Sequence, residues 1–417
     1  MRFIHAADIH LDSPLVGLAR YEGAPVWMLR TATRAAFTAL VDTAIAEAVD
    51  FLVISGDLYD GDWRDYNTGL FFCREMGRLD QAGIPAFLLY GNHDAKSELT
   101  KQLRLPKNVR EFAHRSPGTF HLEHLGVALH GQSFRAAATF DNLAAGYPPA
   151  VRGFLNIGVL HTALEGHAAH DSYAPCAVHE LVAKGYDYWA LGHVHEYAVR
   201  HEAPWVVFPG NLQGRHIREP GERGAVLVTA TRSGLTLERR LVDVLRWQHL
   251  RLDAGGAAGL GEVVDLASHA LECLIRRHTD GRALAVRITL EGRSRAHGEL
   301  FGLESQLRHE ILARANAFAA EQLWIEKVCV ATAPGLSADE LAARSDALHD
   351  LQILLAAAHG DEPFLRMLHD ELRDVVARCP GELLGRVPAL EAIRAGRLDL
   401  LVEEAALNLL ARLAGEP

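Results

Sequence analysis

Apolar residues along the first 240 positions gather in short runs that end in polar residues, and this pattern predicts a parallel sheet. The runs at 3–10, 50–57 and 86–94 each pass from apolar side chains to carboxylates, amides or imidazoles. Between these runs, apolar residues recur at helical spacing over 29–48 and 67–81. Strands that alternate with helices pair in parallel, so their polar carboxyl ends should meet at one edge of the sheet.

The same pattern continues to about residue 240. Two apolar runs, 154–161 and 186–195, end in histidines, and a strand-like run at 206–213 leads into a glycine-rich loop over 214–223. A last strand is predicted at 224–229. Residues 1–240 are therefore expected to form one α/β domain with polar groups at its strand ends.

Beyond residue 240 the pattern changes. Strand-like runs at 244–252, 284–290 and 323–330 alternate with helical stretches, which predicts a small α/β module over 241–335. Ala333-Pro-Gly335 then interrupts the chain, and the leucine stripes of residues 336–417 predict a helical C-terminal region.

Composition and charge narrow the class of protein. The chain has 417 residues and a formal charge of −11, to which residues 336–417 contribute 15 acidic and 8 basic side chains. This acidity is unfavourable for a nucleic-acid binder. Most of it lies in residues 336–417, so the objection is weaker for the first 335 residues. Five scattered cysteines argue against a disulfide framework and against a thiolate zinc site. No apolar run of membrane-spanning length and no signal-peptide pattern occurs, so we expect a cytoplasmic protein without a membrane partner.

The polar groups at the strand ends are all capable of binding metals. Asp8 and His10 are two residues apart and lie on one face of an extended chain, so one cation can contact both. Each motif alone is explained as readily by a turn, but their recurrence at the same end of successive strands favours a metal centre. Asp57 has two oxygens with which to bridge two cations. The remaining candidate ligands are Asn92, His161, His193 and His195.

Arginines supply a second kind of candidate chemistry. Arg215, Arg218 and Arg223 lie in the glycine-rich loop and could neutralise phosphates beside the metals, although a solvated hairpin is an equally good interpretation. The α/β module is also locally basic, which is consistent with a surface that follows DNA. Its arginines are Arg276, Arg277, Arg282, Arg287, Arg293 and Arg295.

Collected in order, the motifs D-x-H, G-D-x-x-D, G-N-H-D, a lone histidine and G-H-x-H resemble the calcineurin-like metallophosphoesterase superfamily over the first 240 residues. The resemblance implies a four-layer αββα sandwich. It also implies that Asp57 is shared between two cations, one held with Asp8, His10 and His195 and the other with Asn92, His161 and His193. His93 would then assist the leaving oxygen, Asp94 would orient His93, and a hydroxide held by the cations would attack phosphorus.

Four segments narrow the resemblance to the SbcD-type DNA-repair exonucleases, and within them to the YhaO-like branch. These segments are His5–Pro14, Gly56–Asp60, Gly192–His195 and Phe208–Asn211. The resemblance implies a double-strand 3′→5′ exonuclease and single-strand endonuclease. It further implies manganese as the metal, with iron, zinc or magnesium as alternatives, and a homodimer. The module at 241–335 would contact DNA as a capping domain, and the C-terminal helices would dock an SMC-like ATPase of the SbcC type.

Two other functions stay open at this point, because fold does not fix substrate. The same metals could serve a phosphoesterase for small molecules or phosphoproteins, which the net acidity favours. Alternatively, the chain could be a mainly architectural subunit whose helical tail recruits the ATPase.

Overall fold

The computed structural model describes residues 1–13, 24–60, 66–96, 103–137, 139–164, 173–277, 281–319, 322–335, 347–379 and 388–414. The chain divides into two compact units. Unit 1 comprises Met1–Gln248 with Gly281–Ala285, and unit 2 comprises His249–Asp280 with Val286–Pro417.

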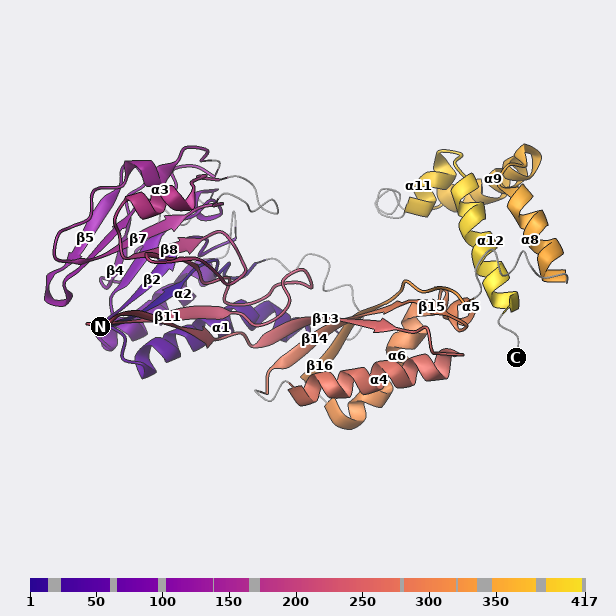
Figure 1. The fold of residues 1–417 in the computed structure, drawn as a ribbon, viewed down its shortest axis with the longest axis horizontal. Coiled ribbons are helices and arrows are strands. Elements are labelled where there is room, and N and C mark those ends of the chain that lie inside the picture. The colour runs from indigo at the N-terminus through magenta and orange to yellow at the C-terminus, as the bar shows by residue number, and fades with distance from the viewer. Residues whose placement is uncertain are drawn as a thin grey trace. The chain divides into compact units, whose positions relative to one another are not determined.

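Unit 1 contains two six-stranded sheets (Figure 1). The first sheet has the strand order β12-β11-β1-β2-β3-β4, in which β1 to β4 run parallel and β11 and β12 are antiparallel additions. Its strands are β1 (Arg2–Ala6), β2 (Phe51–Ser55), β3 (Ala86–Leu89), β4 (Val109–Glu111), β11 (Gly224–Thr231) and β12 (Gly234–Leu241).

The second sheet has the order β5-β6-β7-β8-β10-β9, with parallel inner strands and one antiparallel strand at each edge. Its strands are β5 (Gly118–Leu122), β6 (Val127–Gly131), β7 (Leu155–His161), β8 (Tyr188–Gly192), β9 (Ala198–Glu202) and β10 (Trp205–Phe208). Short 3₁₀ turns occur at η2 (Asp94–Lys96), η3 (Glu123–Leu125) and η4 (Leu143–Gly146).

Three hydrophobic cores separate four layers. Helices α1 (Val26–Ala46) and α2 (Tyr66–Gln81) pack on the first sheet, the two sheets pack on each other, and α3 (Val178–Ala183) packs on the second sheet (Figure 1). Adjacent residues on β2 serve different cores, because Leu52 contacts the helix side and Val53 the sheet side. Burial on both faces explains why these strands read as continuous apolar runs. The expected αββα sandwich is confirmed.

Parallel pairing sets the position of the polar residues. β1, β2 and β3 run in one direction, so the residues that follow them emerge at the same edge of the first sheet. The loop after β1 is bonded to the loop after β2, since the amides of Asp8 and His10 donate to the carbonyls of Gly56 and Asp57. β7 and β8 end at the corresponding edge of the second sheet. The two sheets therefore bring their carboxyl-end residues together.

Unit 2 contains the predicted small α/β module. A three-stranded sheet with the order β13-β14-β16 packs against helices α4 and α6, and a two-stranded ribbon joins β15 to β17. The bounds are β13 (Leu245–Asp253), α4 (Leu260–Arg277), β14 (Ala283–Glu291), β15 (Arg293–Ser294), α5 (His297–Leu300), α6 (Glu304–Ala319), β16 (Leu323–Val330) and β17 (Ala333–Pro334).

The described residues after position 346 are mostly helical. The helices are α8 (Ala347–Ala358), α9 (Glu362–Ala377), α11 (Pro388–Arg394) and α12 (Asp399–Ala414). Leu365, Leu368 and Leu372 of α9 pack with Ile393 and Leu398, which confirms one of the predicted leucine stripes. No helix in the described ranges is long and apolar enough to cross a membrane.

Between the two sheets, His5 must be neutral. Its Nε2 lies 3.1 Å from the Leu191 carbonyl, which can only accept, so Nδ1 accepts from the Tyr188 hydroxyl at 2.9 Å. Burial lowers the pKa of His5 to about 3. The unfolded chain therefore takes up a proton at His5 below pH 6.5 while the folded chain does not.

We accordingly expect stability in the metal-free protein to fall as pH drops from 6.5 toward 4. His5 contributes up to about 1.4 kcal/mol per pH unit to the slope of the free energy of unfolding against pH. In His5→Gln the amide can donate to Leu191 and accept from Tyr188, and the contribution of His5 to the slope is lost. Hydrogen exchange of the β8 amides at several pH values measures the slope. The exposed-histidine control His124→Gln keeps the wild-type slope, and an unchanged slope in His5→Gln would contradict the assignment.

Candidate metal centre

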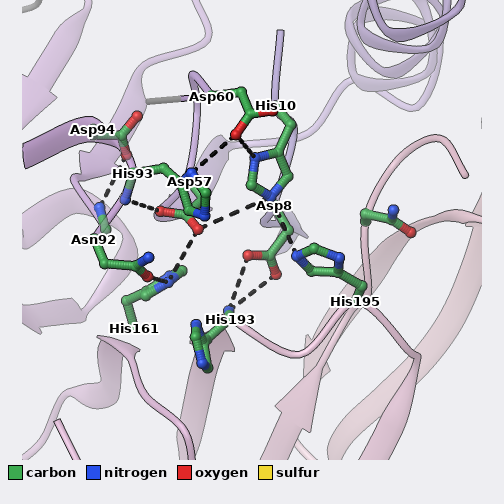
Figure 2. A network of polar contacts seen from close by, with 12 residues as sticks. Asp8, His10, Asp57, Asp60, Asn92, His93, Asp94, His161, His193 and His195 are labelled. Carbon is green, nitrogen blue, oxygen red and sulfur yellow. Dashed lines mark hydrogen bonds and ion pairs between the residues drawn. The ribbon is translucent and has the colours of Figure 1, made fainter. Parts of the chain in front are cut away.

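The side chains predicted at the strand ends converge around Asp57 (Figure 2). Two clusters of candidate ligand atoms form there, beside a third group of His10, Asp60 and His93, and within each the atoms lie within 4.8 Å of one another. One cluster consists of Asp8, His10 and His195, and the other of Asp57, His161 and His193. All except His195 are buried.

Asp57, a member of the second cluster, lies between the histidines of that cluster and the first cluster. Its Oδ2 is 3.9 Å from His10 Nε2 and 3.5 Å from His161 Nε2. The Nε2 atoms of His10 and His195 face each other at 3.2 Å, and Asn92 Oδ1 is 3.0 Å from His161 Nε2. This is the arrangement that a carboxylate shared by two cations requires.

Glycines allow the strand ends to approach this closely. A Cβ on Gly56, whose φ is +99°, would lie 2.3 Å from His161 Nδ1. A Cβ on Gly192 would lie 2.0 Å from the Ser55 carbonyl oxygen. Both contacts are shorter than any side chain tolerates, so the glycines before Asp57 and His193 are required by packing of one sheet on the other.

Backbone strain is concentrated at the candidate ligands. Four of them adopt left-handed conformations that non-glycine residues avoid, at a cost of roughly 1–3 kcal/mol each. Their φ angles are 50° at Asp8, 46° at His10, 51° at Asp57 and 100° at His193. Such strain persists where the surrounding structure fixes functional groups in place.

Buried charges shift the titration of these groups. Burial raises the pKa of Asp8. Burial also opposes ionisation of Asp57, but His161 and His10 outweigh it and hold the pKa of Asp57 well below its usual range. Burial lowers the pKa of His161, yet the charge of Asp57 raises that pKa to about 9. Protonated His161 thus compensates the buried carboxylate when no cation does, whereas burial lowers the pKa of His10 to about 3.

The donor set fits two divalent cations. His161 Nδ1 lies 3.0 Å from the Ser55 carbonyl and His195 Nδ1 lies 2.8 Å from Glu219 Oε1, so each Nδ1 donates and each Nε2 can offer its lone pair inward. Imidazoles with carboxylates and one amide oxygen suit manganese, iron or zinc. Cations bound there would polarise phosphoryl oxygens and activate water.

Asp60, rather than Asp94, contacts the His93 side chain. Asp60 Oδ1 lies 2.9 Å from His93 Nδ1 (Figure 2). Asp94 is buried and accepts hydrogen bonds from the backbone amides of Leu58, Tyr59 and Gly91 at 3.2, 2.8 and 2.9 Å. Asp94 thus fixes the loops after β2 and β3, and Asp60 is the carboxylate seen to meet the His93 imidazole.

The loop arginines have different surroundings. Arg218 is exposed. Arg215 lies beside the centre and is bonded to Glu219. Arg223 is 5% exposed and donates to the carbonyl oxygens of His195 and Pro220. These bonds tie Arg223 to the backbone on both sides of the loop.

Glu219 is the residue that sequence patterns missed. It is 6% exposed, and its carboxylate binds His195 Nδ1 at 2.8 Å, Asn211 Nδ2 at 3.0 Å and Arg215 through backbone and side chain. A carboxylate behind a ligating imidazole fixes its tautomer and orientation. The sequence signal that could have identified Glu219 is its position as an acidic residue among the arginines of the loop that follows Asn211.

The predicted basic surface of unit 2 is partly neutralised internally. Arg276 pairs with Glu272, and Arg287 pairs with Glu326 at 2.6 Å. In unit 1, Arg282 pairs with Asp243 at 3.0 Å. Three of the six arginines therefore have carboxylate partners within the chain, which weakens the expected attraction for nucleic acid.

Residues 1–197 match the family profile of the calcineurin-like phosphoesterases, and residues 247–333 match the middle domain of metallophosphoesterase YhaO. The fold and the donor set thus define a metal-dependent phosphoesterase. The uncharacterized metallophosphoesterase YhaO of Bacillus subtilis (strain 168) is 35% identical over 297 residues, or 70% of this chain and 72% of that protein. The chain belongs to the YhaO family of calcineurin-like metallophosphoesterases.

More distant similarity extends to proteins named DNA double-strand break repair protein Mre11. The one from Methanopyrus kandleri is 27% identical over 58% of this chain and 57% of its own length. The one from Haloferax volcanii is 26% identical over 63% of this chain and 57% of its own length.

Glu219→Gln tests the support of His195. We expect the affinity for Mn²⁺ to fall about 10–100-fold at one of the two sites, which is the usual effect of removing a carboxylate behind a ligating histidine. Isothermal titration of the metal-free protein measures both affinities. Glu222→Gln removes a half-exposed carboxylate from the same loop and should leave both unchanged. Two wild-type affinities in Glu219→Gln would show that Glu219 does not support the site.

Proposed function

We propose that this protein is a DNA phosphodiesterase that uses two divalent cations, acting as a double-strand 3′→5′ exonuclease and single-strand endonuclease in DNA repair. The single observation that carries the proposal is the position of Asp57 between two clusters of ligating groups. Similarity to proteins named for DNA double-strand break repair supports DNA as the substrate.

The proposed site residues have separate roles. Asp8, His10, Asp57 and His195 hold one cation, and Asp57, Asn92, His161 and His193 hold the other. His93 is only partly buried, so it can reach the leaving oxygen and stabilise or protonate it. Burial opposes ionisation of Asp60, but the nearby imidazoles of His10 and His93 keep the pKa of Asp60 well below its usual range. An ionised Asp60 holds a proton on His93 Nδ1 and so directs Nε2 toward the substrate.

The other features of the proposal come from the family resemblance. They are manganese as the metal, a cytoplasmic homodimer, and an SMC-like ATPase docked on residues 336–417. Exposed apolar side chains on α8 and α9, at Ile353, Leu354 and Met367, support the docking role. The match of residues 247–333 to the YhaO middle domain supports a domain division at 1–240, 241–335 and 336–417.

Cleavage of labelled DNA tests the function directly. The full chain loaded with Mn²⁺ should degrade a 3′-recessed duplex and nick single-stranded DNA, because its cations and His93 act on a phosphodiester. Time courses on gels, with and without the ATPase subunit, measure both activities. Internal pairing of Arg282 and Arg287 favours the alternative of a small-molecule or phosphoprotein substrate. Rapid turnover of cyclic nucleotides or phosphopeptides with no cleavage of DNA would establish that alternative.

His93→Ala separates turnover from metal binding. We expect phosphodiester hydrolysis to fall by about 100- to 10,000-fold, the range for a lost general acid. Elemental analysis should still find two cations per chain, because His93 is not among the proposed ligands. His179→Ala, which truncates an exposed histidine on α3, should have wild-type activity. Loss of the metals from His93→Ala would remove the assigned role.

A further inference from the structure

A cavity of 620 Å³ lies beside the metal centre in unit 1, and no role described above uses it. It is lined in part by Asp94, which fixes the loops after β2 and β3. Phe134 also lines it, and its ring packs edge-on against His161 with 5.5 Å between centroids. A ligand in this cavity is therefore close to the proposed reaction centre. Its volume lies in the range of small-ligand sites, about 300–1,000 Å³.

Hydrogen bonds hold the cavity open in a fixed shape. One wall follows β4 and the other follows β6, and Ser133 joins them by donating from Oγ to the Phe112 carbonyl at 2.7 Å and from its amide to the Ala113 carbonyl at 3.1 Å. The Tyr90 amide, at the end of β3, donates to Ser133 Oγ at 3.0 Å, and the Phe134 amide donates to the Tyr90 carbonyl at 2.9 Å. The cavity is thus preformed at the edge where both sheets end.

The charges in the lining favour an anion. Arg115 and Arg135 are exposed, and neither guanidinium has a hydrogen bond or ion pair within the described ranges of the chain. Two acidic side chains also line the cavity, but both have hydrogen-bond donors of their own. Asp94 is buried and accepts from the three backbone amides described above, and Glu111 accepts from the Tyr90 hydroxyl at 2.7 Å. Guanidinium groups that are free of internal partners are well suited to bind phosphate.

The lining also contains ring surfaces for a base. Tyr90 is half-buried and His114 is exposed, and both line the cavity together with the two arginines. Stacking of bases on such rings is largely independent of sequence. A base is available for stacking only when it is unpaired, whereas a closed duplex presents its backbone and groove edges.

We propose that this cavity binds an unpaired nucleotide of the substrate strand, with Arg115 and Arg135 holding its phosphates. The proposal rests on the proposed function, since it takes DNA as the substrate and specifies the form of DNA that enters the site. It makes single-stranded or frayed DNA, rather than a closed duplex, the preferred ligand on unit 1.

Binding of labelled DNA to the full chain in the absence of metal, which prevents cleavage, tests the proposal. The probes are a ten-nucleotide single strand and a blunt duplex of equal length, followed by fluorescence anisotropy over a range of salt concentrations. In Arg115→Gln/Arg135→Gln, affinity for the single strand should fall at least ten-fold. The slope of log affinity against log salt should become shallower by about 1.4, as expected for two lost contacts on a single strand.

Two variants serve as comparisons. Ala113→Trp fills the cavity without changing charge and should also weaken single-strand binding, because Ala113 lines the cavity. Arg152→Gln removes an exposed arginine that lies outside the lining and should bind like wild type. Unfolding midpoints equal to that of wild type exclude misfolding as the cause.

The outcomes separate this proposal from the proposed function. If wild type binds and cleaves DNA but the double variant keeps its affinity and salt slope, the cavity assignment is overturned and the nuclease remains. An equal loss on the blunt duplex would overturn the preference for unpaired nucleotides. If wild type turns over bis(p-nitrophenyl) phosphate but neither binds nor cleaves DNA, the proposed nuclease function is wrong. DNA is then also excluded as the ligand of this cavity.

Discussion

The structure around the centre depends on keeping the charge of Asp57 buried between two sheets. An isolated carboxylate removed from water is very unfavourable, so it must be surrounded by positive charge or hydrogen-bond donors. Here His10 approaches from the first sheet and His161 from the second, and the His93 amide donates to Asp57 Oδ1 at 3.0 Å. Bound cations would satisfy the same requirement. The cations and the packing of the two sheets are therefore thermodynamically coupled.

Further residues hold some of the proposed ligands and His93 in place. Ser55 orients His161 through its carbonyl, Glu219 orients His195, and Asp60 orients His93. Arg223 holds the His195 carbonyl, and the Asn211 amide donates to the same atom at 3.1 Å. The loop between β10 and β11 thus mainly positions His195. Arg215 and Arg223 are bonded within this arrangement, whereas Arg218 is exposed.

The distribution of charge over the molecule agrees with a site that handles phosphates locally. Half of the arginines considered for the capping module have carboxylate partners, and the chain as a whole is acidic. Long-range attraction for DNA is correspondingly weak, and short-range contacts must provide affinity. Two arginines beside the metal centre, without internal partners in the described chain, are well placed to provide such contacts.

The sequence alone indicated the strands that carry the candidate ligands and the types of group at their ends, and its motifs resembled a family with a four-layer sandwich. It could do so because apolar periodicity, glycines at close approaches and strand-end polar residues are local features of the chain. Tertiary structure alone decided which groups face one another. Asp94 adjoins His93 in the sequence and Asp60 lies 33 residues before it, yet Asp60 meets the His93 imidazole and Asp94 accepts from three backbone amides. Glu219 and Arg223 likewise owe their roles to the path of a loop that returns to His195. Such pairings form between residues far apart along the chain, so no local pattern encodes them.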